Sequence, residues 1–229
     1  QSDYLHGLAI AGPKSRNVIQ KLVREDMSND NFKFRDIKKT YVAGVPAIVN
    51  RLSFTGELGY EIYVHAQYQI KLYEEIMEAG KNLNIQEFGS RALMSMRLEK
   101  NWGAWSLDFR PDFTAKETGL DSFINWDKDF IGKNESLKKD SVNKLIVLEI
   151  YTENIDVTGD EAVLAGNKCI GYVTSGGFAH HIKKSIAFAF LDTTKISNNK
   201  INVEINGNFY LASIIKEPLY DKDGLKMRS

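Results

Sequence analysis

The chain has 229 residues, of which 43% are hydrophobic and 26% charged, and its 30 basic residues balance its 30 acidic ones. This composition is typical of a globular protein with a real core, and it excludes a disordered chain, a fibrous protein and a disulfide scaffold. Because the chain has neither a basic excess nor an apolar run of about 20 residues, we expect no nucleic acid and no membrane as partners.

Two features of single residues bear on context. Cys169 is the only cysteine and has no partner for an internal disulfide, so we expect a reducing compartment, the cytoplasm. On its expected strand it should be a small buried hydrophobe and not a nucleophile. The chain starts with Gln1 instead of methionine, which favours a piece of a longer protein with further chemistry upstream.

The first 100 residues alternate between strand and helix patterns. A short buried strand is expected over residues 4–11, after which Gly12-Pro13 permits a helix to begin. Further elements follow in chain order: a helix containing Val18, Ile19, Leu22 and Val23, a strand over 40–52 interrupted at Gly44-Val45-Pro46, a strand over 60–65, and amphipathic helices at 70–80 and about 92–100.

The second half reads differently. Residues 101–118 are aromatic and irregular and should form an ordered loop, and the helical period stops near residues 138–143. We therefore expect two domains, 1–140 and 141–229. Strand patterns over 145–150, 201–206 and 209–215, with turns at Gly166-Asn167 and Asn206-Gly207, suggest a small closed unit. The fold class is thus α+β: an antiparallel sheet with packed helices, followed by a small C-terminal β-barrel or jelly-roll-like domain.

Common catalytic signatures are absent from the sequence. The four histidines, at positions 6, 65, 180 and 181, do not pair with Cys169 or with carboxylates at metal-ligand spacing, so we expect no metal. The sequence also has no GxSxG elbow, no Walker loop and no GxGxxG motif. A serine hydrolase and a nucleotide-binding enzyme are therefore not supported.

One segment stands out, SFTGELGYEIYV at residues 53–64. Its glycines permit a tight turn, and the strand after it should place Glu61, Tyr63 and His65 on one face and Tyr60 on the other. A carboxylate beside aromatic rings suits a flat heterocycle, because it accepts two parallel hydrogen bonds from an amidine-like edge. The alternative interpretation is a solvated glutamate on an edge strand.

Seven ordered motifs resemble the glycine-cleavage T-protein (aminomethyltransferase) superfamily. They are DYLHGLAIAGPKSR at 3–16, the 53–64 segment, SMRLEK at 95–100, DFIGK at 129–133, GYVTSGG at 171–177, KSIA at 184–187 and PLYD at 218–221. Within the superfamily, Trp105, residues 110–112 and 119–121, and the run ending at His180 most resemble the folate-binding half of dimethylglycine and sarcosine dehydrogenases. The resemblance covers almost the whole chain.

The resemblance implies a tetrahydrofolate site in a central cavity. It implies that Glu61 holds the pterin edge and that Phe54 lies beside the folate, where many relatives have a tyrosine. Phe54 keeps the stacking surface without the hydroxyl, which leaves two alternatives: a lower affinity, or a role passed to Tyr60 or Tyr63. Arg91 lies close to a folate-contacting arginine of T-proteins, and Met94 replaces a usual aspartate. The remaining residues that the resemblance implies at the ligand are Trp105, His180 and Tyr220.

For function, the resemblance implies the folate-binding portion of a dimethylglycine- or sarcosine-dehydrogenase-like protein, which serves one-carbon transfer to tetrahydrofolate. Its expected partners are folate, a methylated amine or its iminium, and a flavoprotein domain or subunit that holds FAD. The family's catalytic aspartate lies in a segment before Gln1, so the catalytic residue stays unknown and the chain should be an incomplete catalyst by itself. The alternatives are a stand-alone aminomethyl- or methyltransferase and a non-catalytic folate-binding module.

Overall fold

The computed structural model describes residues 4–138, 141–196 and 200–229. It divides into two compact units, the first made of residues 1–100 and 220–229 and the second of residues 101–219. The predicted domain boundary at residue 140 itself lies outside the described residues. The division by packing differs from it, because residues 101–138 belong to the second unit and the last ten residues return to the first.

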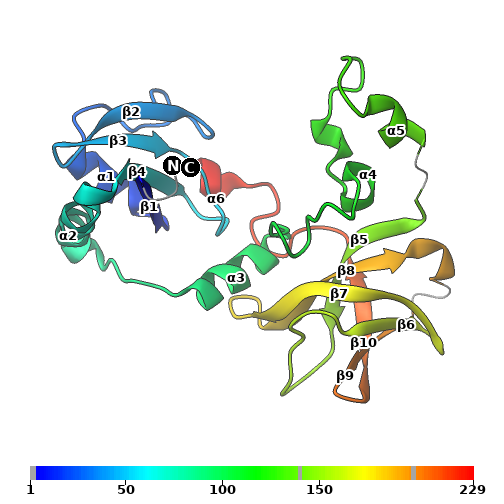
Figure 1. Cartoon of the computed structure of the whole chain (residues 1–229). Coiled ribbons are helices and arrows are strands. Elements are labelled where there is room, and N and C mark those ends of the chain that lie inside the picture. Colours follow the sequence, from blue (N-terminus) through cyan, green and yellow to red (C-terminus); the bar gives the residue numbers. More distant parts are fainter. Residues whose placement is uncertain (1–3, 139–140, 197–199) are drawn as a thin grey trace. The chain divides into compact units, whose positions relative to one another are not determined.

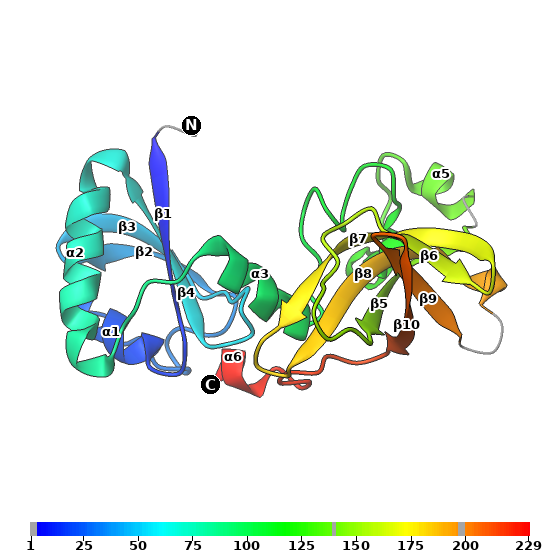
Figure 2. The same cartoon turned by 90° about the horizontal axis from the view of Figure 1, so that it is seen from below.

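The first unit is a four-stranded antiparallel sheet with helices (Figures 1 and 2). The strand order is β1-β4-β3-β2, so β4 lies inside the sheet. Its elements are β1 (Leu5–Ala11), α1 (Ser15–Leu22), β2 (Ile37–Val42), β3 (Val45–Asn50), β4 (Gly59–His65), α2 (Gln69–Gly80), α3 (Ser90–Glu99) and α6 (Leu225–Arg228), with single 3₁₀ turns at Ala66–Tyr68 and Lys81–Leu83.

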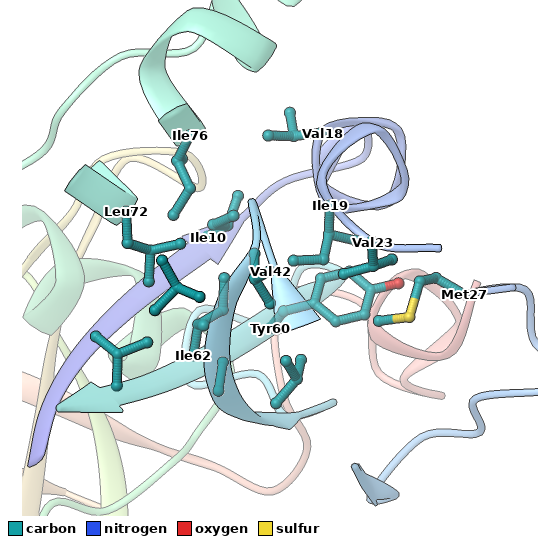
Figure 3. Packing of buried hydrophobic residues seen from close by; sticks show 14 of the residues in the cluster. Ile10, Val18, Ile19, Val23, Met27, Val42, Tyr60, Ile62, Leu72 and Ile76 are labelled. Carbon is teal, nitrogen blue, oxygen red and sulfur yellow. The ribbon is translucent and has the colours of Figure 1, made fainter. Parts of the chain in front are cut away.

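One face of this sheet carries the core of the first unit. The apolar residues of α1 and α2 pack against inward-facing residues of all four strands, as Figure 3 shows for Ile19, Leu72 and Ile62. The expected spacing in the first helix is confirmed, since Val18 and Ile19 are buried while Lys21 is exposed. Burying apolar surface on one face only is the usual solution for an antiparallel sheet.

The second unit is built on a closed six-stranded barrel with strand order β10-β5-β8-β7-β6-β9. The barrel confirms the predicted fold class, and closure leaves no exposed sheet edge. The elements of the second unit are α4 (Ala115–Thr118), a 3₁₀ turn at Asp121–Phe123, α5 (Lys133–Lys138), β5 (Asn143–Ile150), β6 (Ala162–Ala165), β7 (Lys168–Ala179), β8 (Lys184–Asp192), a 3₁₀ turn at Thr193–Lys195, β9 (Ile201–Ile205) and β10 (Asn208–Ile215).

Several local predictions can be compared with the barrel. The hairpin turns at residues 166–167 and 206–207 are confirmed. The burial predicted for Cys169 is wrong, because the side chain is exposed near the start of β7. Where β7 and β8 pair, Gly171 has no room for a side chain, since a Cβ there would lie 2.0 Å from the Phe190 carbonyl oxygen. Among the described residues, no helix is both long and apolar enough to cross a membrane.

Candidate functional site on the open face of the first sheet

The sheet face opposite the helices of the first unit is called the open face here. Each of its members is exposed or half-buried. The members are Leu5, Gly7 and Ala9 of β1, Glu61, Tyr63 and His65 of β4, Pro46, Ile48 and Asn50 of β3, and Ile37, Lys39 and Tyr41 of β2. The predicted alternation along β4 is confirmed, because Glu61 and Tyr63 lie on this face while Tyr60 is buried.

A carboxylate and a phenol form the polar centre of the open face. The Tyr63 hydroxyl donates a hydrogen bond of 2.7 Å to Oε2 of Glu61. This hydrogen bond, together with burial and the negative charge of Glu61, raises the pKa of Tyr63 to about 12. The phenol therefore stays protonated and remains a donor across the neutral pH range. Oε1 of Glu61 and the second lone pair of Oε2 are left for another donor.

The strands beside β4 supply the surroundings of Glu61. Ala9 of β1 and Asn50 of β3 lie directly opposite it in the two pairings. Oδ1 of Asn50 is buried and has no hydrogen-bond partner among the described residues. Because β4 is an interior strand, the alternative interpretation of Glu61 as a residue on an edge strand is wrong.

Tyr60 points the other way. It is 1% exposed and belongs to the core of the first unit, as Figure 3 shows. Its ring stacks on Phe32 at a centroid distance of 6.1 Å, and its hydroxyl accepts a hydrogen bond from Nε of Arg16. Of the two β4 tyrosines predicted near the ligand, only Tyr63 is on the face of Glu61.

The turn before β4 is fastened by the C-terminal segment. The Tyr220 hydroxyl donates to Oε1 of Glu57 and accepts from Nζ of Lys226. Burial and the hydrogen bond to Glu57 raise the pKa of Tyr220. Gly56 has a positive φ of 85°, and a Cβ there would lie 3.2 Å from the Lys100 side chain. Tyr220 is thus a structural partner of this turn, where Phe54 is half-buried.

The remaining predicted site residues belong to other elements of the chain. Arg91 is exposed in the first turn of α3. Trp105 and His180 are exposed and belong to the second unit. Trp105 has an edge contact with Phe109, and His180 has one with Phe178 near the turn between β7 and β8.

A cavity of about 1020 Å³ in the first unit is separate from these residues. It is lined by β1, the α1 start, α2 and residues 83–89 and 93, and none of the predicted site residues lines it. Its lining includes core residues such as Val18 and Ile76. In the described part of the chain, no group of three or more His, Cys, Asp or Glu side chains could hold a metal ion.

Two residues that the sequence reasoning missed are buried and polar. Asp108, fully buried in the second unit, accepts hydrogen bonds from the Ala104 amide and from the hydroxyls of Thr174 and Ser175. Arg51, 1% exposed in the first unit, donates to backbone carbonyls of residues 32, 228 and 229. Neither lies in a motif with a recognisable pattern, so no local signal could have found them.

Two family models match the chain, one over most of the first part and one over the barrel. The family model described as GCVT N-terminal domain matches residues 1–128, and the one described as glycine cleavage T-protein C-terminal barrel domain matches residues 143–221. The chain belongs to the glycine cleavage T-protein family. The resemblance seen in the seven motifs is confirmed.

Two kinds of curated relative match this T-protein family member. Human mitochondrial dimethylglycine dehydrogenase is 39% identical over 225 residues, which are 95% of this chain and 26% of that protein. The aminomethyltransferase of Caldanaerobacter subterraneus subsp. tengcongensis is 37% identical over 228 residues, which are 97% of this chain and 60% of that protein. The chain therefore spans about a quarter of the dehydrogenase and three-fifths of the transferase.

A solved structure shows the same fold. The glycine cleavage system aminomethyltransferase T from Bartonella henselae superposes with a TM-score of 0.82 over 95% of this chain and 60% of that chain, at 22% identity.

Proposed function

We propose that this chain is the tetrahydrofolate-binding part of a dimethylglycine- or sarcosine-dehydrogenase-like protein and serves one-carbon transfer to tetrahydrofolate. The observation that carries the proposal is the position of Glu61, which lies on the open face with a phenol already hydrogen-bonded to one of its oxygens. The dimethylglycine dehydrogenases and aminomethyltransferases among the relatives support the type of chemistry.

The residues present fit a pterin. Its edge carries adjacent N–H donors, and the Glu61 carboxylate retains acceptor positions on both oxygens after bonding Tyr63. Beside it, Asn50 adds a polar amide whose Oδ1 has no partner within the described residues. The direct neighbour of Glu61 on β1 is Ala9, whose small side chain leaves the face low enough there for a flat ring.

Within this proposal, Glu61 orients the ligand and Tyr63 keeps the carboxylate in place. Bound tetrahydrofolate would supply the amines that capture a carbon at the formaldehyde level. Holding it in a fixed orientation raises the effective concentration of these amines. We also propose that the oxidation step belongs to a flavoprotein domain or partner subunit, because the sequence holds no GxGxxG motif, and that the chain alone is an incomplete catalyst.

The experiment is a calorimetric titration of the full-length protein with tetrahydrofolate under anaerobic conditions. In Glu61→Gln, one acceptor oxygen becomes a donor that faces a ligand donor. Affinity should therefore fall by about 2–4 kcal/mol, or about 30- to 1,000-fold.

Glu87→Gln is the matched control, because Glu87 is an exposed carboxylate that accepts a 2.6 Å hydrogen bond from the Tyr73 hydroxyl. It should bind like the wild type. Glu57 is a poorer control, since it holds Tyr220. No binding by the wild type, or equal binding by wild type and Glu61→Gln, would overturn the proposal.

A further inference from the structure

The ring of Tyr63 lies on a glycine of the neighbouring strand. Gly7 is the direct partner of Tyr63 in the β1–β4 pairing. A Cβ built on Gly7 would approach Cε1 of the Tyr63 ring to 3.1 Å and Cδ1 to 3.3 Å. Gly7 is not among the residues with positive φ, so its backbone conformation does not require glycine. The lack of space above Gly7 requires glycine, because the Tyr63 ring occupies that space.

This placement puts the hydroxyl of Tyr63 against its neighbour on the same strand face. Residues two apart in a strand share a face, and the Tyr63 hydroxyl lies 2.7 Å from Oε2 of Glu61. On its β1 side Glu61 faces Ala9, which bears only a methyl group. Among the described residues, the hydrogen bond from Tyr63 is the only one recorded for the carboxylate of Glu61.

A long carboxylate side chain on an open face samples several rotamers, and one fixed donor reduces that freedom. We propose that Tyr63 is the positioning residue of Glu61 and that Gly7 supplies the space its ring needs. This inference rests on the proposed function. It differs from a stacking role for Tyr63, in which the ring itself would contact the ligand and the hydroxyl would be dispensable.

Tyr63→Phe separates the two roles, because it keeps the ring and removes the donor. In calorimetric titrations of the full-length protein with tetrahydrofolate, Tyr63→Phe should bind about 5- to 30-fold more weakly than wild type. The same change made in a Glu61→Gln background should cause little further loss, because the group being positioned is gone. A merely structural tyrosine would weaken both backgrounds by the same factor.

Two further variants complete the test. Gly7→Val changes neither Glu61 nor Tyr63 but pushes the Tyr63 ring, and its hydroxyl with it, away from Glu61. It should therefore weaken binding as Tyr63→Phe does, and again only when Glu61 is present. Tyr73→Phe removes the hydroxyl of the Tyr73–Glu87 pair and should bind like the wild type. Thermal melts establish that each variant is folded.

The outcomes are distinguishable. If Glu61→Gln weakens binding while Tyr63→Phe binds like wild type, the positioning role is overturned and the proposed function stands. If Tyr63→Phe and Gly7→Val weaken the Glu61→Gln protein as much as the wild type, the positioning role is likewise overturned. If the wild type does not bind tetrahydrofolate, or Glu61→Gln binds it equally well, the proposed function fails and this inference fails with it.

Discussion

Replacing Asp108 with alanine should severely destabilise the second unit. The carboxylate is fully buried and fastens residues 104–108 to the barrel strand β7. Its Oδ2 accepts from the Ala104 amide at 2.7 Å, and its Oδ1 accepts from the Ser175 hydroxyl at 2.7 Å and from the Thr174 hydroxyl. Alanine keeps the backbone and removes these three acceptor contacts at once.

The size of the destabilisation depends on whether each of the three donors finds another acceptor once Asp108 is replaced. The Thr174 hydroxyl can turn fully to the Phe188 carbonyl, which already lies 3.2 Å away. The Ala104 amide is fixed by the backbone, and the Ser175 hydroxyl loses its charged acceptor. Two hydrogen bonds to a buried charge at about 1.5–3 kcal/mol each give a loss of about 3–6 kcal/mol in the free energy of unfolding. That is a large share of the stability of an ordinary domain.

The chain offers a selective probe for this measurement. All three tryptophans, Trp102, Trp105 and Trp126, belong to the second unit, so tryptophan fluorescence in urea reports on its unfolding alone. With a slope of about 1.5 kcal/mol per molar urea, the midpoint for Asp108→Ala should fall by about 2–4 M. Asp108→Asn keeps one acceptor oxygen, so its urea midpoint should lie between those of Asp108→Ala and the wild type.

Asp112→Ala is the matched control on the same loop. The Asp112 side chain is 70% exposed and has a 3.5 Å contact with Nε of Arg110. It should change the free energy of unfolding by less than about 0.5 kcal/mol. A midpoint for Asp108→Ala within about 0.5 M of the wild type would refute the reasoning.

Two further predictions concern the first unit. Arg51→Met removes the donors to the carbonyls of Arg228 and Ser229. Amide hydrogen exchange at residues 225–229 should therefore become faster, and the free energy of unfolding should fall by about 2–4 kcal/mol. Unchanged exchange at these residues would contradict the role of Arg51 in holding the C-terminal segment. Tyr63 has a folded-state pKa of about 12 against 10.0 unfolded, so its contribution to stability is fully present below pH 10 and lost as pH rises to 12. Denaturation midpoints measured between pH 10 and pH 12 should thus fall more for the wild type than for Tyr63→Phe. Equal declines of the two proteins would contradict this contribution of Tyr63 to stability.

Periodicity was sufficient to predict which residues of β4 share a face. Side chains alternate in a strand with a period of two, so Glu61 and Tyr63 had to lie together, with Tyr60 opposite. It could not predict the neighbours. Gly7 and Asn50 come to the Glu61 pair through strand pairing across 56 and 11 residues of sequence, and no local pattern encodes that register.

The role of Tyr220 shows the same limit over a longer separation. Its motif predicts a residue near the ligand but carries no sign of its hydrogen-bond partner, and its hydroxyl donates to Glu57, 163 residues away in the sequence. The last ten residues leave the barrel and join the first unit, a return that hydrophobic patterning does not encode. Cys169 was predicted to be buried from residue type alone, and its position near the turn before β7 exposes it.

An antiparallel sheet often has one face in water, so an open face alone says little about function. A face that is simply solvated carries mostly polar and charged side chains, and the open face does not. Ile37 is 66% exposed and Tyr41 is 64% exposed on β2, while the centre holds a carboxylate in contact with a phenol over a glycine. Exposed apolar side chains around a few oriented polar groups are the composition of a binding surface. This composition, and not exposure, is the physical reason behind the proposal that the ligand binds at Glu61.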